Sequence, residues 1–106
     1  MTTRELERDD TEIVNSVLAA VRPQFPAFVR DTVFQLRADH DGDPAVWIWL
    51  ILDDDTELES RAIQMELRRV RLLIEDGVFG SGTDRWPFVS VRTVSEQQDR
   101  LARGVA

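Results

Sequence analysis

Hydrophobic residues are most concentrated at residues 45–52, where eight apolar residues follow one another and several are β-branched or aromatic. Turn-forming residues at 41–44 precede this run, and three aspartates at 53–55 follow it. A short apolar run with such boundaries is typical of a strand that is buried on both faces. One face of this strand would carry Trp47 and Trp49, so either the chain itself or a partner must cover that face.

The preceding segments predict a helix and a second strand. Apolar residues spaced by three and four indicate a helix over residues 11–21, which Pro23 would end. Alternation of apolar and polar residues at 32–38 indicates a half-buried strand. The turn residues at 40–43 would join this strand to the strand at 45–52 as an antiparallel hairpin.

A second helix is predicted after the strand at 45–52. Thr56, with Glu59 three residues later, matches the capping-box pattern at the start of a helix. We expect this helix to run to about Asp76, because Gly77 is suited to the C-terminal end of a helix. The residues expected on its buried stripe are Ile63, Leu67, Val70 and Ile74.

The C-terminal part predicts one more strand and one more helix. A glycine-rich loop at 77–85 leads into a strand at 86–94, which begins with a proline at its second position. Ser95 and Gln98 form another capping-box pattern, which predicts a short last helix that ends at about Arg103.

The order of the elements is therefore α-β-β-α-β-α. It predicts an α+β fold in which a three-stranded sheet, mixed or antiparallel, has helices packed mainly on one face. The order resembles that of the second class of KH domains, but the Gly-x-x-Gly motif of that class has no counterpart at its position here, so its function is not carried over. We expect one compact domain over residues 11–103, and a charged extension over 1–10 that either continues the helix or frays.

Composition narrows the possible functions. The net charge is −7, with 20 acidic residues, 13 arginines and no lysine. This balance opposes nonspecific nucleic-acid binding, which depends on phosphate neutralisation, and it suits a basic protein partner. The absence of cysteine excludes thiolate catalysis and cysteine-ligated metal. Neither a bilayer-spanning apolar run nor a signal-peptide core is found, so we expect a cytoplasmic protein that does not bind membranes.

The first candidate site is the sheet face that carries the two tryptophans, here called the tryptophan face. We expect the helices to cover the opposite face, which includes Ile48, Leu50 and Val91. Aromatic residues among arginines are common in protein interfaces, and they also stack on RNA bases. Protein contact is the preferred interpretation. Cover by the chain's own helices, or by cation–π stacking of its arginines, comes second, and nucleic acid comes third because of the net charge. The residues expected on this face are Val33, Gln35, Ile51 and Ser90, together with the candidates for partner contact, Trp47, Trp49, Phe88, Arg37 and Arg92.

The second candidate site is an apolar row on the second helix. Leu58, Met65 and Leu72 recur every seven residues, nearly opposite the expected core stripe. Such a row predicts contact with another helix, which belongs either to a partner or to this chain. Glu57 and Arg61 have the i,i+4 spacing of a solvent-exposed ion pair. The polar side next to the row is formed by Arg61, Gln64, Arg68 and Arg71.

The main acidic cluster consists of Asp53, Asp54 and Asp55, followed by Glu57 and Glu59. Carboxylates at a strand end can hold Mg²⁺ beside a phosphate substrate. Acidic residues before a helix are more often caps and partners of the helix dipole. We therefore expect no metal site, no cofactor and no catalytic residue.

These patterns together predict a small, acidic, non-enzymatic protein-binding domain. Its partner would be a protein, either a second copy of the chain or a basic protein, and binding to nucleic acid is not expected. An antitoxin-like or accessory member of a two-protein system fits this description. Two alternatives stay open, namely a nucleic-acid or nucleotide binder that uses Trp47 and Trp49, and a metal-dependent enzyme at 53–55.

Overall fold

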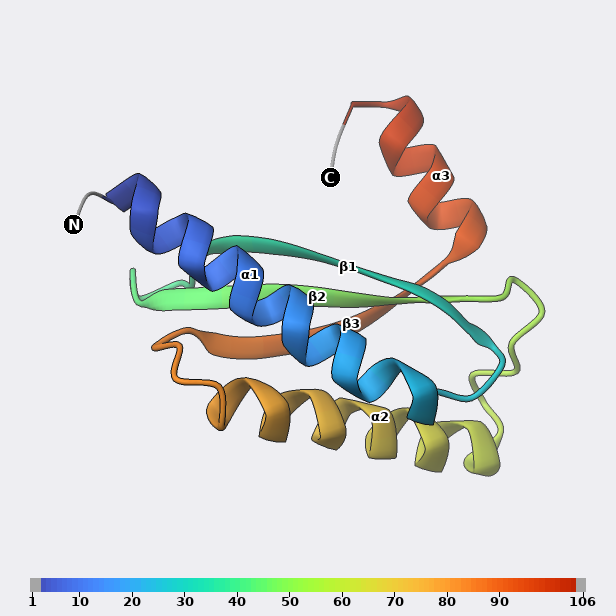
Figure 1. Ribbon diagram of the computed structural model, residues 1–106. Coiled ribbons are helices and arrows are strands. Elements are labelled where there is room, and N and C mark those ends of the chain that lie inside the picture. The colour runs from blue at the N-terminus through green and yellow to red at the C-terminus, as the bar shows by residue number, and fades with distance from the viewer. Residues whose placement is uncertain (1–2, 105–106) are drawn as a thin grey trace.

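The computed structural model describes residues 3–104, and over this range it confirms the predicted order of helices and strands (Figure 1). None of the helices in this range combines the length and the apolar character that crossing a membrane requires. The elements are α1 (Thr3–Val21), the 3-10 helix η1 (Arg22–Gln24), β1 (Val29–Ala38), β2 (Pro44–Leu52), α2 (Arg61–Phe79), β3 (Trp86–Thr93) and α3 (Val94–Ala102).

The three strands form one mixed sheet in the order β1-β2-β3, so β2 is central and β1 and β3 are its edges. β1 and β2 form the predicted antiparallel hairpin, in which Val33 lies opposite Trp49. β2 and β3 run parallel, with Trp47 opposite Phe88. Parallel neighbours need a long crossover connection, and α2 lies within this connection.

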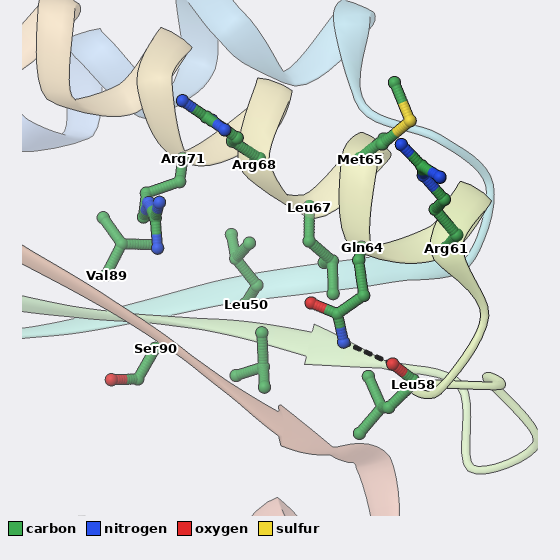
Figure 2. Close-up of a pocket in the computed structure, with 11 residues that line it drawn as sticks. Leu50, Leu58, Arg61, Gln64, Met65, Leu67, Arg68, Arg71, Val89 and Ser90 are labelled. Carbon is green, nitrogen blue, oxygen red and sulfur yellow. Dashed lines mark hydrogen bonds between the residues drawn. The ribbon is translucent and has the colours of Figure 1, made fainter.

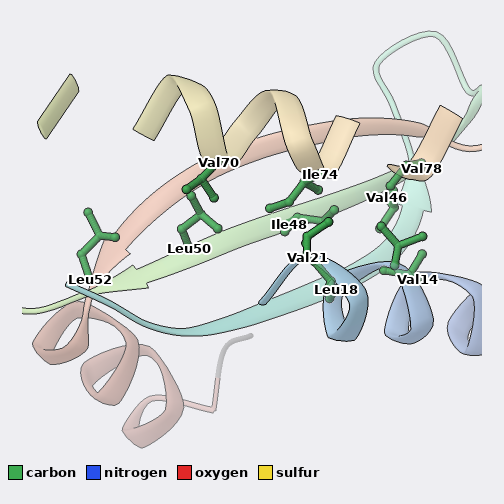
Figure 3. Packing of buried hydrophobic residues seen from close by; sticks show 11 residues of the cluster. Val14, Leu18, Val21, Val46, Ile48, Leu50, Leu52, Val70, Ile74 and Val78 are labelled. Atoms are coloured by element: carbon green, nitrogen blue, oxygen red, sulfur yellow. The ribbon is translucent and has the colours of Figure 1, made fainter. Parts of the chain in front are cut away.

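The hydrophobic core lies between the sheet and the two long helices α1 and α2 (Figure 3). Alternate residues of β2 point into this core, so Ile48 and Leu50 are almost completely buried. Phe25 and Phe28, from the connection between η1 and β1, pack against it. α1 and α2 therefore share one face of the sheet. The buried cluster consists of Val14, Val17, Leu18, Val21, Val46, Ile48, Leu50, Leu52, Val70, Ile74 and Val78.

The N-terminal end of α2 differs from the prediction. Its N-cap is Ser60, whose hydroxyl accepts a hydrogen bond from the amide of Ile63 at 3.5 Å. The hydroxyl of Thr56 instead donates to the carbonyl of Asp53 at 2.7 Å and closes a turn after β2. The capping box predicted for Thr56 and Glu59 is therefore wrong, because the chain turns there before it becomes helical.

The C-terminal end of α2 also differs, because the helix continues through Gly77 to Phe79. Gly77 is not among the described glycines with the positive φ that is typical of a helix-terminating glycine. It marks a close contact between helices instead. A Cβ atom at Gly77 would lie 2.6 Å from Cγ1 of Val17 in α1. The missing side chain thus allows α1 and α2 to approach each other.

The cap of α3 is formed by Thr93 and Glu96 and not by the predicted pair Ser95 and Gln98. The hydroxyl of Thr93 accepts a hydrogen bond from the amide of Glu96 at 3.1 Å, and the Glu96 carboxylate accepts one from the amide of Thr93 at 3.3 Å. Ser95 donates from its amide, at 3.0 Å, and from its hydroxyl to the carboxylate of Asp54. The predicted cap residue therefore ties α3 to the end of β2.

A partly buried ion pair fastens the start of β3. Arg85 Nε lies 2.7 Å from a carboxylate oxygen of Asp10 in α1, and the same guanidinium donates to the carbonyl of Ala45 at 2.9 Å. The hydroxyl of Thr83 donates to the other oxygen of Asp10 at 2.9 Å. This network joins α1, β2 and the loop before β3.

Candidate functional site

The structure brings the residues predicted for the tryptophan face together on the side of the sheet that faces away from the core. In the pairing register, Gln35 lies opposite Trp47, and Trp47 lies opposite Phe88. The rings of Trp47 and Phe88 are stacked, with 4.5 Å between their centroids. Trp49 lies beside Ser90, the next residue of β3 on this face.

Two arginines stack on the tryptophans. Cζ of Arg37 lies 4.6 Å from the ring centroid of Trp47, and Cζ of Arg92 lies 4.0 Å from that of Trp49. Arg92 is only 7% exposed and donates a hydrogen bond to Gln97 of α3 at 2.8 Å. Burial is the main cause that lowers the pKa of Arg92. The guanidinium groups that were predicted to contact a partner are thus engaged within the chain.

The tryptophan face is therefore partly closed by the protein itself. α3 lies over the end that carries Ile51 and Arg92, and both residues are buried. Trp47, Trp49 and Phe88 are each half-buried. The indole N–H of Trp47 is buried and has no hydrogen-bond acceptor among the described residues. Partner binding through this face stays a prediction.

Asp54 anchors α3 beside the end of β2. Its carboxylate accepts hydrogen bonds from the hydroxyl and the amide of Ser95. These hydrogen bonds lower the pKa of Asp54 below its ordinary value of 3.8, because both favour the charged carboxylate. The bond from the Ser95 hydroxyl has the larger effect, and the bond from the Ser95 amide has the smaller one.

We expect this anchor to be lost only in strong acid. Because the folded-state pKa is lowered, the contribution of Asp54 to stability is complete above pH 3.8 and disappears as the pH falls through the lower folded-state pKa. A ¹³C NMR titration of the Asp54 carboxyl carbon should give a pKa below 3.8, and S95A should raise it toward that value. S90A, which changes an exposed serine of β3, is the control and should leave the titration unchanged. An S95A titration identical to that of the wild type would contradict the anchor.

A groove of about 510 Å³ lies between α2 and β3, and we call it the α2–β3 groove (Figure 2). Three of its side chains are large, apolar and exposed, namely Met65 at 64%, Leu58 at 37% and Val91 at 39%. Such exposure on a small protein marks a surface that a partner can cover. The apolar lining residues are Leu50, Leu58, Met65, Leu67, Val89 and Val91.

Two of the three residues in the predicted apolar row meet in this groove. Leu58 belongs to the loop before α2, and the side-chain amide of Gln64 donates to its carbonyl and holds that loop against the helix (Figure 2). Met65 lies about one helical turn after Arg61, the first residue of α2. Leu72 is exposed on α2 but does not line the groove. No element within residues 3–104 buries these three side chains, so neither the first nor the last helix covers them.

Val91 is the groove residue that sequence reasoning placed wrongly. Alternation along β3 puts it on the same side of the sheet as Leu50, and we expected the helices to cover that side. It is exposed instead, because α2 leaves part of the edge strand uncovered. The sequence around Val91 does not predict this exposure, because whether a strand residue is buried depends on the position of a helix that is distant in the sequence.

Three arginines of α2 line the same groove. Arg71 reaches toward Val89, whereas Arg61 and Arg68 lie along the rim that α2 forms (Figure 2). Nε of Arg71 lies 3.6 Å from a carboxylate oxygen of Glu75. Arg61 and Arg68 have no ion pair with any carboxylate of the described residues.

The ion pair predicted between Glu57 and Arg61 is wrong, because Glu57 lies in the loop before α2 and the helical i,i+4 spacing does not apply. Among residues 3–104, no acidic residue lines the groove. The groove is therefore locally positive on a chain whose net charge is −7.

The free edge of β3 runs along this groove. β3 pairs only with β2, and Pro87 near its start is typical of an edge strand. The free edge of β1 has a register shift between Val29 and Asp31 and carries the charged residues Arg30, Asp31 and Arg37. Bulges and charges protect an edge from pairing with other strands, so β3 is the less protected edge of this sheet.

Two of the three aspartates at the end of β2, Asp53 and Asp54, are engaged within the chain. Asp53 pairs with Arg30 at 3.4 Å. In the described part of the chain, the group of carboxylates whose oxygens lie within 4.8 Å of one another is formed by Asp39, Asp41 and Asp43 at the hairpin turn. There the Asp39 carboxylate accepts hydrogen bonds from the backbone amides of Asp41 and Asp43, at 2.9 and 3.0 Å. These bonds order the turn.

Comparison with known proteins found no match for this chain among protein-family models, curated proteins or solved structures. The function is therefore inferred from the geometry of the two surfaces alone.

Proposed function

We propose that this chain is a non-enzymatic protein-binding domain that binds an extended segment of its partner in the α2–β3 groove. The observation that carries the proposal is that the less protected edge of the sheet lies next to exposed apolar side chains. The backbone of an incoming strand would pair with the free edge of β3. Alternate side chains of that strand would enter the groove beside Met65 and Val91.

The proposal keeps a protein as the partner but moves the main contact away from the tryptophan face. On the tryptophan face the aromatic rings are half-buried, and Arg37 and Arg92 already stack on them. In the α2–β3 groove, by contrast, the apolar side chains are exposed. Binding there buries apolar area that the isolated protein leaves in water, which favours association. Main-chain hydrogen bonds to β3 would add to the affinity.

NMR with an uncharged strand-forming peptide tests this proposal. The probe is an eight-residue peptide in which Val alternates with Thr, flanked by Gly-Ser pairs. It should cause saturable shifts in the amide signals of β3 and of the α2 residues around Met65. V91R places a long charged side chain in the groove and should abolish these shifts. L101R makes the same kind of change at an exposed leucine of α3 and should leave them intact.

Three results would overturn the proposal. The first is the absence of any saturable shift, the second is binding that V91R leaves unchanged, and the third is a set of shifts centred on β1 or on the tryptophan face. Circular dichroism of both variants, compared with that of the wild type, shows whether the fold is intact.

A further inference from the structure

We infer that the segment bound in the α2–β3 groove is acidic, and that Asp or Glu alternates with apolar residues on the strand face that enters the groove. This inference rests on the proposed function. It is carried by the charge of the groove, in which Arg61, Arg68 and Arg71 lie around an apolar floor and no carboxylate is among the lining residues. Carboxylates of the bound segment would supply the partners that Arg61 and Arg68 lack within the described chain.

The spacing of the arginines suits an extended segment. Arg61 and Arg71 are ten residues apart on α2, which corresponds to about 15 Å along a helix axis. Side chains on one side of a strand repeat about every 6.6 Å, so two to three of them fit within that length. On the side of a paired strand that faces α2, successive side chains can therefore be apolar against Met65 and Val91 and acidic against the arginine rim, while the intervening side chains point to the other face of the sheet.

The charge of the groove predicts an acidic partner, whereas the net charge of the chain predicts a basic one. The net charge of −7 favours a basic partner at long range. At physiological ionic strength, interactions between exposed charges are largely screened beyond about 8 Å. A segment in contact with the groove therefore interacts more strongly with Arg61 and Arg68, which have no ion pair among the described residues, than with the distant carboxylates.

A second copy of the chain suits this groove less well than an acidic segment. Two copies joined symmetrically through antiparallel β3 edges would extend one sheet and place both α2 helices on the same side of it. The arginine rims of the two copies would then face each other with no carboxylate from either groove between them. Like charges brought together in this way oppose association.

Nucleic acid is also disfavoured at this site. Single-stranded nucleic acid is usually held by aromatic rings on which the bases stack. In the described part of the chain, no aromatic residue lines the α2–β3 groove. Trp47, Trp49 and Phe88 lie on the opposite face of the sheet.

Three matched peptides test the charge of the bound segment. Each has the eight-residue core Val-Ser-X-Ser-Val-Ser-X-Ser, in which X is Glu, Thr or Lys, so that Val and X share one face of the strand. Affinities are measured by calorimetry in ~0.15 M salt. A single exposed ion pair typically changes affinity by about threefold, so pairs with Arg61 and Arg68 predict about tenfold tighter binding of the Glu peptide than of the Thr peptide. The Lys peptide should bind most weakly. High salt should reduce these differences.

Charge reversal locates the effect. In R61E/R68E the order of the peptides should reverse, so that the Lys peptide binds better than the Glu peptide. The control R22E/R103E changes the net charge by the same amount at two exposed arginines outside the groove, and it should keep the wild-type order. An unchanged order in R61E/R68E, or the same reversal in the control, would overturn the inference.

The remaining outcomes separate this inference from the proposed function. Equal affinities for the three peptides, with binding still abolished by V91R, would overturn the acidic segment and leave the groove as a binding site. Absence of binding by all three would overturn both. A dimer that forms in analytical ultracentrifugation and is lost in V91R would identify a second copy as the occupant. Binding of a twelve-nucleotide oligo-dT tighter than that of the Glu peptide, and lost in R61E/R68E, would identify nucleic acid. Either of these last two results would overturn the acidic segment.

Discussion

Replacing Ile74 by alanine should lower the free energy of unfolding by about 2–5 kcal/mol. Ile74 is fully buried in the core cluster, where α2 faces the sheet (Figure 3). The truncation removes apolar contacts and leaves a cavity that the neighbouring side chains fill only in part. Urea unfolding followed by circular dichroism measures the change.

Leu72 on the same helix provides the matched control. It is 45% exposed, so L72A should change the free energy of unfolding by less than about 1 kcal/mol. The pair of variants therefore reports which side of α2 faces the sheet. If L72A costs as much as I74A, α2 is rotated about its axis, and the α2–β3 groove does not lie where we describe it.

Replacing Gly77 by alanine should destabilise the protein by about 1–3 kcal/mol, although alanine is the better helix former by about 1 kcal/mol. The added Cβ would lie 2.6 Å from Cγ1 of Val17, so the two helices must separate or the valine must leave its rotamer. Thermal or urea unfolding of G77A measures the net effect.

Truncating Val17 should reverse the sign of this effect. V17A is destabilising by itself, because Val17 belongs to the core, but it removes the methyl group that the new Cβ would meet. In the V17A background, G77A should therefore stabilise the protein by up to about 1 kcal/mol, which is the gain in helix propensity. The double-mutant cycle gives the coupling between the two positions. An effect of the same sign in both backgrounds would contradict the close contact of α1 and α2.

The periodic parts of this fold could be predicted from the sequence because local patterns determine them. The alternation in β1 and the apolar run of β2 fix which residues share a face, and the spacing in α1 and α2 fixes the core stripes. The helix ends could not be predicted in this way. Thr56 and Ser60 are both competent caps, and the structure uses Ser60 because Thr56 closes the turn that leads out of β2. Glycine often marks the end of a helix, but Gly77 lies within α2 and allows α1 and α2 to pack closely.

The candidate site was predictable to a similar extent. The exposure of Met65 follows from its position away from the core stripe, and the grouping of Trp47 with Phe88 follows from strand alternation. The degree to which the tryptophan face is covered was not predictable. It depends on where α3 lies and on which rings the arginine side chains stack. The groove itself arises because β3 pairs in parallel with β2 and so lies beside α2, which brings together residues that are distant in the sequence.

The mixed pairing of the sheet has a consequence for the order of folding. β1 and β2 are neighbours in the chain, whereas β3 can join β2 only after the whole of α2 has crossed the sheet. Closing the longer loop costs more chain entropy, so the hairpin forms more readily than the parallel pair. In the interval, the most apolar strand of the protein has one edge without a partner. A newly made chain is therefore most prone to aggregation through β2, and the docking of β3 ends that risk.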